Sequence, residues 1–198
     1  MVGGFTREIR KWLNGIIYTV YLVYCRFRFG KNVCLIDLKR FKFAIVDKED
    51  YDRLRKRSWR CRRFDDCWYA VRWVRASEKS NKTVAWMHRA VLEAPEGTLV
   101  DHKNHNGLDN RKDNLRLATY SQNMQNRRKI RRACSSRFKG VMFRKEVHRR
   151  RRWRGSIKVG GWMIELGMFK TEVEAARAYD AAAKKHFGEF ACLNFPES

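Results

Sequence analysis

The sequence predicts an α+β protein in which a ββα core precedes a three-stranded antiparallel sheet packed on one helix. Two stretches carry this prediction. Residues 98–128 read as a strand, a wide polar loop, a second strand and a capped helix. Residues 141–187 read as three short strands followed by one alanine-rich helix. The length of 198 residues suits one medium domain or two small ones.

Composition divides the chain into five segments. They are an apolar and basic helix (1–30), a mixed β-rich region (31–82), the core (83–128), a basic linker (129–136) and the C-terminal module (137–198). In the first segment, apolar residues between Gly15 and Cys25 recur at helical spacing, which favours a packing helix. A peripheral membrane contact is the alternative, and the stretch is too short to span a bilayer.

Charge is the strongest compositional signal. The chain has 45 Lys and Arg against 21 Asp and Glu, a net charge of +24. Such an excess indicates a polyanionic partner, with double-stranded DNA first and an anionic membrane surface second; a merely soluble basic protein is the third interpretation. The six cysteines form no C-x-x-C pair, so we expect reduced thiols, no zinc site and an intracellular location.

The region before the core predicts a small mixed fold. We expect strands at Val33–Leu38, Phe41–Val46 and Trp68–Val74, because these runs are apolar, β-branched or aromatic. A short polar helix is predicted after the second strand. Asp47 is positioned to cap this helix, with Asp50 as the acidic capping partner three residues on.

The core groups side chains that suit phosphodiester hydrolysis. The first strand ends with Asp101 and His102, and a capping box of Thr119 and Gln122 places Asn123 in the first turn of the helix. An imidazole titrates near pH ~6.5 and can accept a proton from water. Asp101 and Asn123 offer the hard oxygen ligands that a divalent ion accepts, Mg²⁺ first and Mn²⁺ second.

The stretches M-H-R, V-D-H, L-D-N-R, D-N-L-R and S-Q-N-M-Q-N-R resemble the HNH endonuclease family, specifically the phage and intron-encoded homing enzymes. The resemblance implies a metal-dependent DNA endonuclease. It implies that Asp101 is a metal ligand and His102 the general base. By the same resemblance, Asn114 ties the loop and positions the base, and Asn123 completes the metal site.

Two further histidines and three arginines near the core were also assigned expected roles. His88 is expected to pack or to hydrogen-bond rather than to bind metal, and His105 to be exposed or to contact phosphate. His102 and His105 have H-x-x-H spacing, but no second pair of zinc ligands is evident, so zinc is not expected. Three arginines beside the core are expected to contact DNA: Arg116, Arg127 and Arg128.

The stretches S-R-F-K-G-V, I-E-L-G-M-F, E-A-A-R-A-Y-D-A-A-A and L-N-F-P resemble the APETALA2-type DNA-binding domain of plant ethylene-response factors. The resemblance implies a sheet that lies in the major groove of DNA, where base edges are distinguishable. The implied contact residues are Arg144, Arg152, Trp153, Arg154 and Lys158. Met142, Ser156 and Glu165 depart from the family pattern, so the plant target sequence is not carried over. The run 149–152 is either a phosphate contact or a solvated loop.

Two rival functions stay open. A non-catalytic DNA-binding regulator could retain a nuclease-like fold, and RNA binding or RNA cleavage is the third possibility. The combination of Asp101, His102, Asn114 and Asn123 favours the endonuclease over the regulator. The absence of an aromatic stacking motif from the sheet disfavours RNA. The oligomeric state is left open by these patterns.

Overall fold

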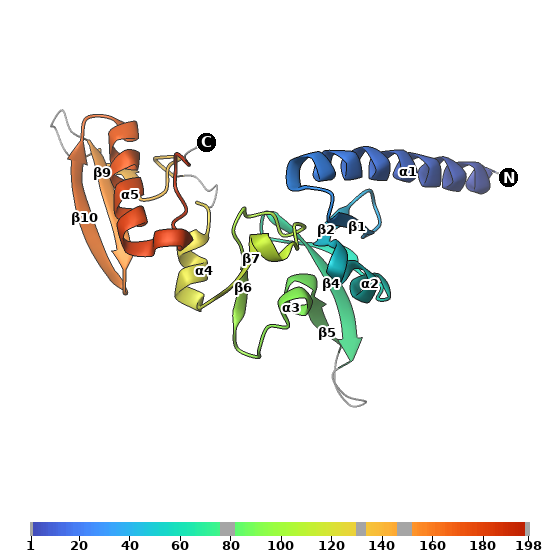
Figure 1. Cartoon of the computed structure of the whole chain (residues 1–198). Helices are drawn as coiled ribbons and strands as arrows, with labels where there is room; N and C mark the ends of the chain where they lie inside the picture. The colour runs from blue at the N-terminus through green and yellow to red at the C-terminus, as the bar shows by residue number, and fades with distance from the viewer. Residues whose placement is uncertain (1, 76–81, 130–133, 146–151, 197–198) are drawn as a thin grey trace. The chain divides into compact units, whose positions relative to one another are not determined.

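The computed structural model describes residues 2–75, 82–129, 134–145 and 152–196 (Figure 1). These residues form two compact units, Met1–Ala118 and Thr119–Ser198. The predicted α+β class is confirmed, because helices occur together with antiparallel sheets and the C-terminal three-stranded sheet packs on one helix.

The first unit is built from small antiparallel sheets and short helices. Its elements are α1 (Val2–Phe29), β1 (Val33–Asp37), β2 (Phe43–Asp47), α2 (Lys48–Arg55), β3 (Arg60–Phe64), β4 (Cys67–Arg75), β5 (Lys82–Trp86), α3 (Met87–Leu92), β6 (Leu99–His102), the 3₁₀ turn η1 (Lys112–Asn114) and β7 (Leu115–Ala118). The sheets are β1–β2, β3–β4–β5 and β6–β7. Each is antiparallel throughout.

One buried apolar cluster connects the β6–β7 hairpin with the elements that precede it. Leu115 of β7 packs in the same cluster as Val46 of β2, Leu54 of α2, Ala70 of β4 and Met87 of α3. All of these residues are almost completely buried. The core predicted at residues 83–128 therefore shares its hydrophobic interior with the region 31–82.

Helix α1 packs on the β1–β2 hairpin, as expected for the N-terminal apolar stretch. Cys25 is fully buried against this hairpin, and the rings of Tyr18 and Phe43 meet edge to face with centroids 5.5 Å apart. Over the residues that the structure describes, no helix combines the length and the apolar character needed to cross a membrane.

The structure corrects three details of the first unit. Asp47 precedes α2, but the prediction that its side chain caps the helix is wrong: no capping hydrogen bond forms, and the carboxylate binds elsewhere. Strand β2 begins at Phe43 rather than Phe41, because Lys39, Arg40 and Phe41 have positive φ angles of 69°, 54° and 56° and form a turn. The strands β3 and β5 were not predicted.

The second unit contains α4 (Tyr120–Asn126), β8 (Val141–Phe143), β9 (Trp153–Val159), β10 (Trp162–Phe169), α5 (Glu172–Phe187) and the 3₁₀ turn Gly188–Phe190. Its antiparallel sheet has the order β10–β9–β8. Both predicted capping boxes are confirmed, Thr119 with Gln122 and Thr171 with Glu174. Ile157 of β9 packs against Tyr179 and Ala183 of α5, so one face of the sheet is buried under this helix.

Lysine side chains hold α4 on the C-terminal module. The Nζ atom of Lys139 donates hydrogen bonds to the carbonyl oxygens of Gln125 (2.6 Å) and Arg127 (2.7 Å). The Nζ atom of Lys129 donates to the carbonyl oxygen of Phe138 at 2.7 Å. Residues 130–133 of the predicted linker lie outside the described residues. The contacts on either side of them make α4 part of the second unit.

Candidate active site

The site begins with the pair that ends β6. Asp101 stands opposite Arg116 of β7, and His102 stands opposite Leu115. The Oδ2 atom of Asp101 accepts a hydrogen bond from Arg116 Nε at 2.9 Å and lies 2.8 Å from Arg116 Nη2. Both side chains are about nine-tenths buried. The guanidinium thus fixes the carboxylate, and Arg116, expected to contact DNA, is engaged with Asp101.

His102 lies in an aromatic pocket. Its ring centroid is 5.7 Å from that of Tyr69 and 5.1 Å from that of His88, both edge to face. Burial lowers the pKa of His102 to about 4, and this effect outweighs the raising effects of the Asn110, Asp101 and Asp109 side chains. The imidazole is therefore neutral near pH 7, which is the form that can accept a proton.

His88 of α3 packs beside His102. It is buried, and its ring lies 5.5 Å from Trp86 and 6.0 Å from Tyr69, measured between centroids. Burial, with a smaller contribution from His102 and Arg89, lowers the pKa of His88 to about 3. Two neutral imidazoles can lie against each other without charge repulsion, so His88 forms a wall of the pocket around His102.

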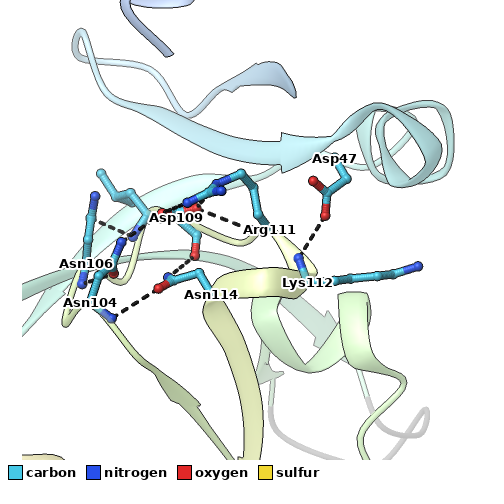
Figure 2. Close-up of polar contacts among 8 residues, drawn as sticks. Asp47, Asn104, Asn106, Asp109, Arg111, Lys112 and Asn114 are labelled. Atoms are coloured by element: carbon cyan, nitrogen blue, oxygen red, sulfur yellow. Dashed lines mark hydrogen bonds and ion pairs between the residues drawn. The ribbon is translucent and has the colours of Figure 1, made fainter. Parts of the chain in front are cut away.

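Asn114 ties the ends of the polar loop between β6 and β7 (Figure 2). Its Nδ2 atom donates to the carbonyl oxygen of Asp109 at 2.8 Å, and its Oδ1 atom accepts from the backbone N of Asn104 at 3.0 Å. The carbonyl oxygen of Asn114 accepts from the backbone N of Lys103 at 2.9 Å. A single buried amide therefore bridges both sides of the loop that follows His102.

Asp109 is the centre of the loop's charged network. Its side chain is completely buried. Arg111 donates to it twice, from Nε to Oδ1 and from Nη2 to Oδ2, both at 2.8 Å. Asn104 Nδ2 donates to Oδ2 at 2.8 Å (Figure 2). The Arg111 guanidinium lies 3.7 Å from the ring centroid of Phe29, so the last residue of α1 covers this ion pair.

The loop docks on β2 through one isolated β-bridge. The backbone N of Ile45 donates to the carbonyl oxygen of Leu108, and the backbone N of Asn110 donates to that of Ile45, both at 2.8 Å. The bridge between Ile45 and Asp109 is parallel. Gly107 lies so close to β4 that an added Cβ would be 2.5 Å from the Trp68 carbonyl oxygen. The loop conformation is thus set by β2 and β4.

The Asp47 carboxylate completes this docking. Its Oδ2 atom accepts a hydrogen bond from the backbone N of Lys112 at 2.8 Å (Figure 2). The Lys112 side chain reaches back to Glu49 of α2, with Nζ 2.5 Å from Oε1. The start of α2 and the turn before β7 are therefore held together by residues more than sixty positions apart in the chain.

Two predicted oxygen ligands lie in different units. Asp101 ends β6 in the first unit, and Asn123 lies in the first turn of α4 in the second, partly exposed. A carboxylate and an amide oxygen fit the donor preference of Mg²⁺ or Mn²⁺. Over the residues that the structure describes, no three His, Cys, Asp or Glu side chains gather into a group able to share a metal ion.

The sheet of the second unit has one face turned away from α5. Strand pairing places Met142 beside Arg154 and Met163 beside Lys158, and Met142 and Met163 are 50% and 61% exposed. The backbone N of Arg144 donates to the carbonyl oxygen of Arg152 at 2.9 Å, which extends the β8–β9 pairing. By strand alternation, Arg144, Arg152, Arg154 and Lys158 share the outer face.

Trp153 and Arg154 were both expected to contact DNA, but their side chains make contacts within the protein. Trp153 lies on the helix side, packed in the core cluster of Phe138 and Ala175, with its ring 4.9 Å from Phe143. Arg154 lies on the outer face, but Glu165 of β10 pairs with it, with Nε 3.2 Å from Oε1. Arg149–Arg151 lie outside the described residues. Arg127 and Arg128 are exposed after α4.

Comparison with known proteins assigns the segment that carries Asp101 and His102. Residues 85–125 match the model of the HNH endonuclease family. This segment is therefore similar in sequence to HNH endonucleases. The chain is also 38% identical over 100 residues to an uncharacterized HNH endonuclease of Acanthamoeba polyphaga mimivirus, a match that covers 50% of this chain and 49% of the viral protein. The chain therefore spans about half the length of this relative.

The C-terminal region has a different relative. It is 46% identical over 63 residues to APETALA2-like protein 2 of Oryza sativa subsp. indica and, equally, to that of subsp. japonica. These matches cover 31% of this chain and 14% of the rice proteins. The chain thus joins a segment similar to HNH endonucleases to a segment similar to APETALA2-like proteins, as the sequence motifs predicted.

Sequence reasoning missed the residues that hold the loop in place. The stretch L-D-N-R contains Asp109 and Arg111, but the buried ion pair within it was not predicted. Asp47 was assigned to helix capping, and Ile45 to an ordinary strand. The sequence did contain a local signal for this ion pair. An Asp and an Arg two residues apart in a loop can form a bidentate ion pair without a contribution from another helix or strand.

Proposed function

We propose that this protein is a metal-dependent DNA endonuclease of the site-directed homing type. The observation that carries the proposal is the buried, neutral His102 beside the Arg116-held carboxylate of Asp101, inside the matched HNH segment. A neutral imidazole next to a fixed carboxylate supplies a base and an oxygen ligand at adjacent positions.

In the proposed reaction, His102 removes a proton from a water molecule. The water oxygen attacks the phosphorus atom, and the bond from phosphorus to the 3′ oxygen breaks. The products carry a 5′-phosphate and, once the leaving oxygen is protonated, a 3′-hydroxyl. Asn114 keeps the loop after His102 closed, and Tyr69 and His88 exclude solvent from the other sides of the imidazole.

Asp101 and Asn123 are the residues that would hold the divalent ion, with Mg²⁺ the first choice. When bound, such an ion stabilises the negative charge that develops on the phosphate and the leaving oxygen. The role of Arg116 is then to orient the Asp101 carboxylate, because its guanidinium is bound to Oδ2.

A supercoiled plasmid tests the metal requirement. We expect cleavage with added Mg²⁺, no cleavage after chelation with EDTA, and recovery when Mg²⁺ is restored in excess. Asp101→Ala should lose cleavage in the presence of Mg²⁺, and Asp66→Ala, an exposed aspartate between β3 and β4, is the matched control. Cleavage that survives both EDTA and Asp101→Ala would refute the metal role.

We further propose that the outer face of the β8–β9–β10 sheet binds double-stranded DNA and directs the cut. Arg144→Ala should weaken binding to duplex DNA at all salt concentrations. Arg152→Ala, at an exposed position, should mainly reduce the slope of log affinity against log salt by about 1, as expected for one lost phosphate contact. Fluorescence anisotropy at several salt concentrations measures both. If neither variant changes binding, another surface contacts DNA.

A non-catalytic DNA-binding regulator is the alternative function, and the similarity to APETALA2-like proteins is the observation that favours it. The same plasmid assay separates the two functions. A regulator binds the plasmid without nicking it, with or without Mg²⁺, whereas the endonuclease converts it to nicked or linear forms. Duplex RNA in place of DNA tests the third possibility.

A further inference from the structure

Helix α1 uses one face to pack on its own unit. Cys25 is fully buried, and Tyr18, Tyr21, Leu22 and Phe29 pack with it against the β1–β2 hairpin. A helix that only packs on one surface is usually polar on the opposite side. In α1 the opposite side is apolar as well.

This opposite side carries a continuous stripe of exposed apolar residues. They are Ile9, Leu13, Ile16, Val20, Val23 and Phe27, and between 39% and 91% of each is exposed. At roughly 100° per residue, all six directions lie within about 40° of their mean direction, which points away from Cys25. Exposure of this much aliphatic surface indicates an interaction site.

The spacing of the stripe identifies the kind of partner. Steps of four and three residues alternate from Ile9 to Phe27, which is the a/d pattern of a coiled coil over about three heptads. This 3.5-residue period keeps a seam aligned along a second helix, whereas a flat lipid surface requires no such period. The spacing therefore favours a second helix over a membrane as the partner.

We propose that the α1 helices of two copies of this chain pair along this stripe to form a dimer. A two-fold pairing places the same surface on both sides, so a single apolar stripe is sufficient. The residues that flank it over its central part are uncharged: Trp12, Ile17, Thr19 and Tyr24. Over this central part, two chains of charge +24 can meet without placing like charges opposite each other, and the arginines Arg10 and Arg26 flank only the ends of the stripe.

A hollow beside the stripe supports close pairing. It is open and is lined by Trp12, Gly15, Ile16, Thr19 and Val20. No atom lies within 4 Å of the position that a Cβ on Gly15 would occupy. A side chain from the facing helix can enter there, as knobs enter holes between paired helices. The dimer would carry two copies of the His102 site, a stoichiometry suited to cutting both strands.

Sedimentation equilibrium of the full chain, free of nucleic acid, tests the dimer. The measurement uses roughly 1 M salt, where the Debye length is about 3 Å and charge-mediated association is suppressed. The average mass of the wild type in solution should rise with protein concentration towards the mass of a dimer. Val20→Lys should raise the dimer dissociation constant by roughly 30-fold or more, because it places a charge in the centre of the seam.

Ser58→Lys is the matched control, because it adds the same charge at an exposed residue that follows α2 and lies outside the stripe and its flanks. Its dissociation constant should stay within about threefold of the wild-type value. Val20 is 64% exposed in the single chain, so both variants should keep the wild-type circular dichroism and melting temperature.

Three results would overturn the dimer. They are a monomer mass for the wild type at every concentration, equal weakening by both substitutions, and a monomer that co-sediments with phosphatidylcholine vesicles and loses this binding on Val20→Lys. The last result would assign the stripe to a lipid surface. None of these measurements depends on DNA cleavage, so the proposed nuclease activity is tested separately.

Discussion

His102→Ala should lower the rate of DNA cleavage by roughly 10²–10⁴-fold, the range for loss of a positioned general base. The imidazole is buried, neutral near pH 7 and adjacent to Asp101. Alanine offers no group that can accept the proton of water, so the chemical step alone should slow. Binding to duplex DNA should persist, because the proposed DNA-binding sheet belongs to the second unit.

The measurement is single-turnover cleavage of a supercoiled plasmid, with anisotropy of the same variant on duplex DNA. His186→Ala, on the exposed side of α5, is the control for the loss of a histidine elsewhere. The melting temperature must also be recorded, since truncation of a side chain packed on Tyr69 and His88 leaves a cavity. A cleavage rate within a few-fold of wild type, with binding intact, would exclude His102 as the base.

Local patterns predicted the elements that local interactions determine. The capping boxes at Thr119 and Thr171, the helix that ends at Gly188 and the β6–β7 pair depend on residues close in sequence. Strand β3, R-C-R-R-F, has few apolar residues and forms because it pairs with β4 in a continuous register. No periodicity within five residues could predict that pairing.

Asp47 shows why part of the site could not be predicted. Its position before a polar helix is typical of an N-cap, and an isolated segment would use it so. In the folded unit, the backbone N of Lys112 lies 2.8 Å from its Oδ2. This partner is 65 residues further along the chain. The Asp101 and His102 pair was predicted from the motif, whereas the β2 edge that supports their loop depends on long-range backbone pairing.

Trp153, in the second unit, is another residue whose position depends on packing that the sequence did not predict. The strand β9 was predicted, but the side of the sheet that faces α5 was not, because Trp153 and its neighbours include both apolar and basic residues. Packing decides the question: Gly155 and Ile157 are buried, so Trp153, which alternates with them, also faces the helix. Arg154 and Lys158 are then left on the outer face.

Asp109→Ala should destabilise the first unit by about 3–5 kcal/mol, the usual cost of removing one member of a buried ion pair. Asp109 is fully buried, and the Arg111 side chain is only 13% exposed, so the guanidinium would remain in the interior without a carboxylate. The melting temperature of this unit should fall by roughly 10 °C or more. Cleavage should be lost as well, because Asn104, in the loop that follows His102, donates to the same carboxylate.

Asp113→Ala is the matched control, since Asp113 lies in the same loop with its side chain exposed; its melting temperature should change little. The double variant Asp109→Ala with Arg111→Met separates the two contributions. Removing both charges eliminates the unpaired guanidinium, so part of the stability should return. Cleavage should not return, because Asn104 still lacks the acceptor that fixes the loop. Recovery of stability together with full cleavage would show that Asp109 has only a structural role, and that His102 does not depend on the loop for its position.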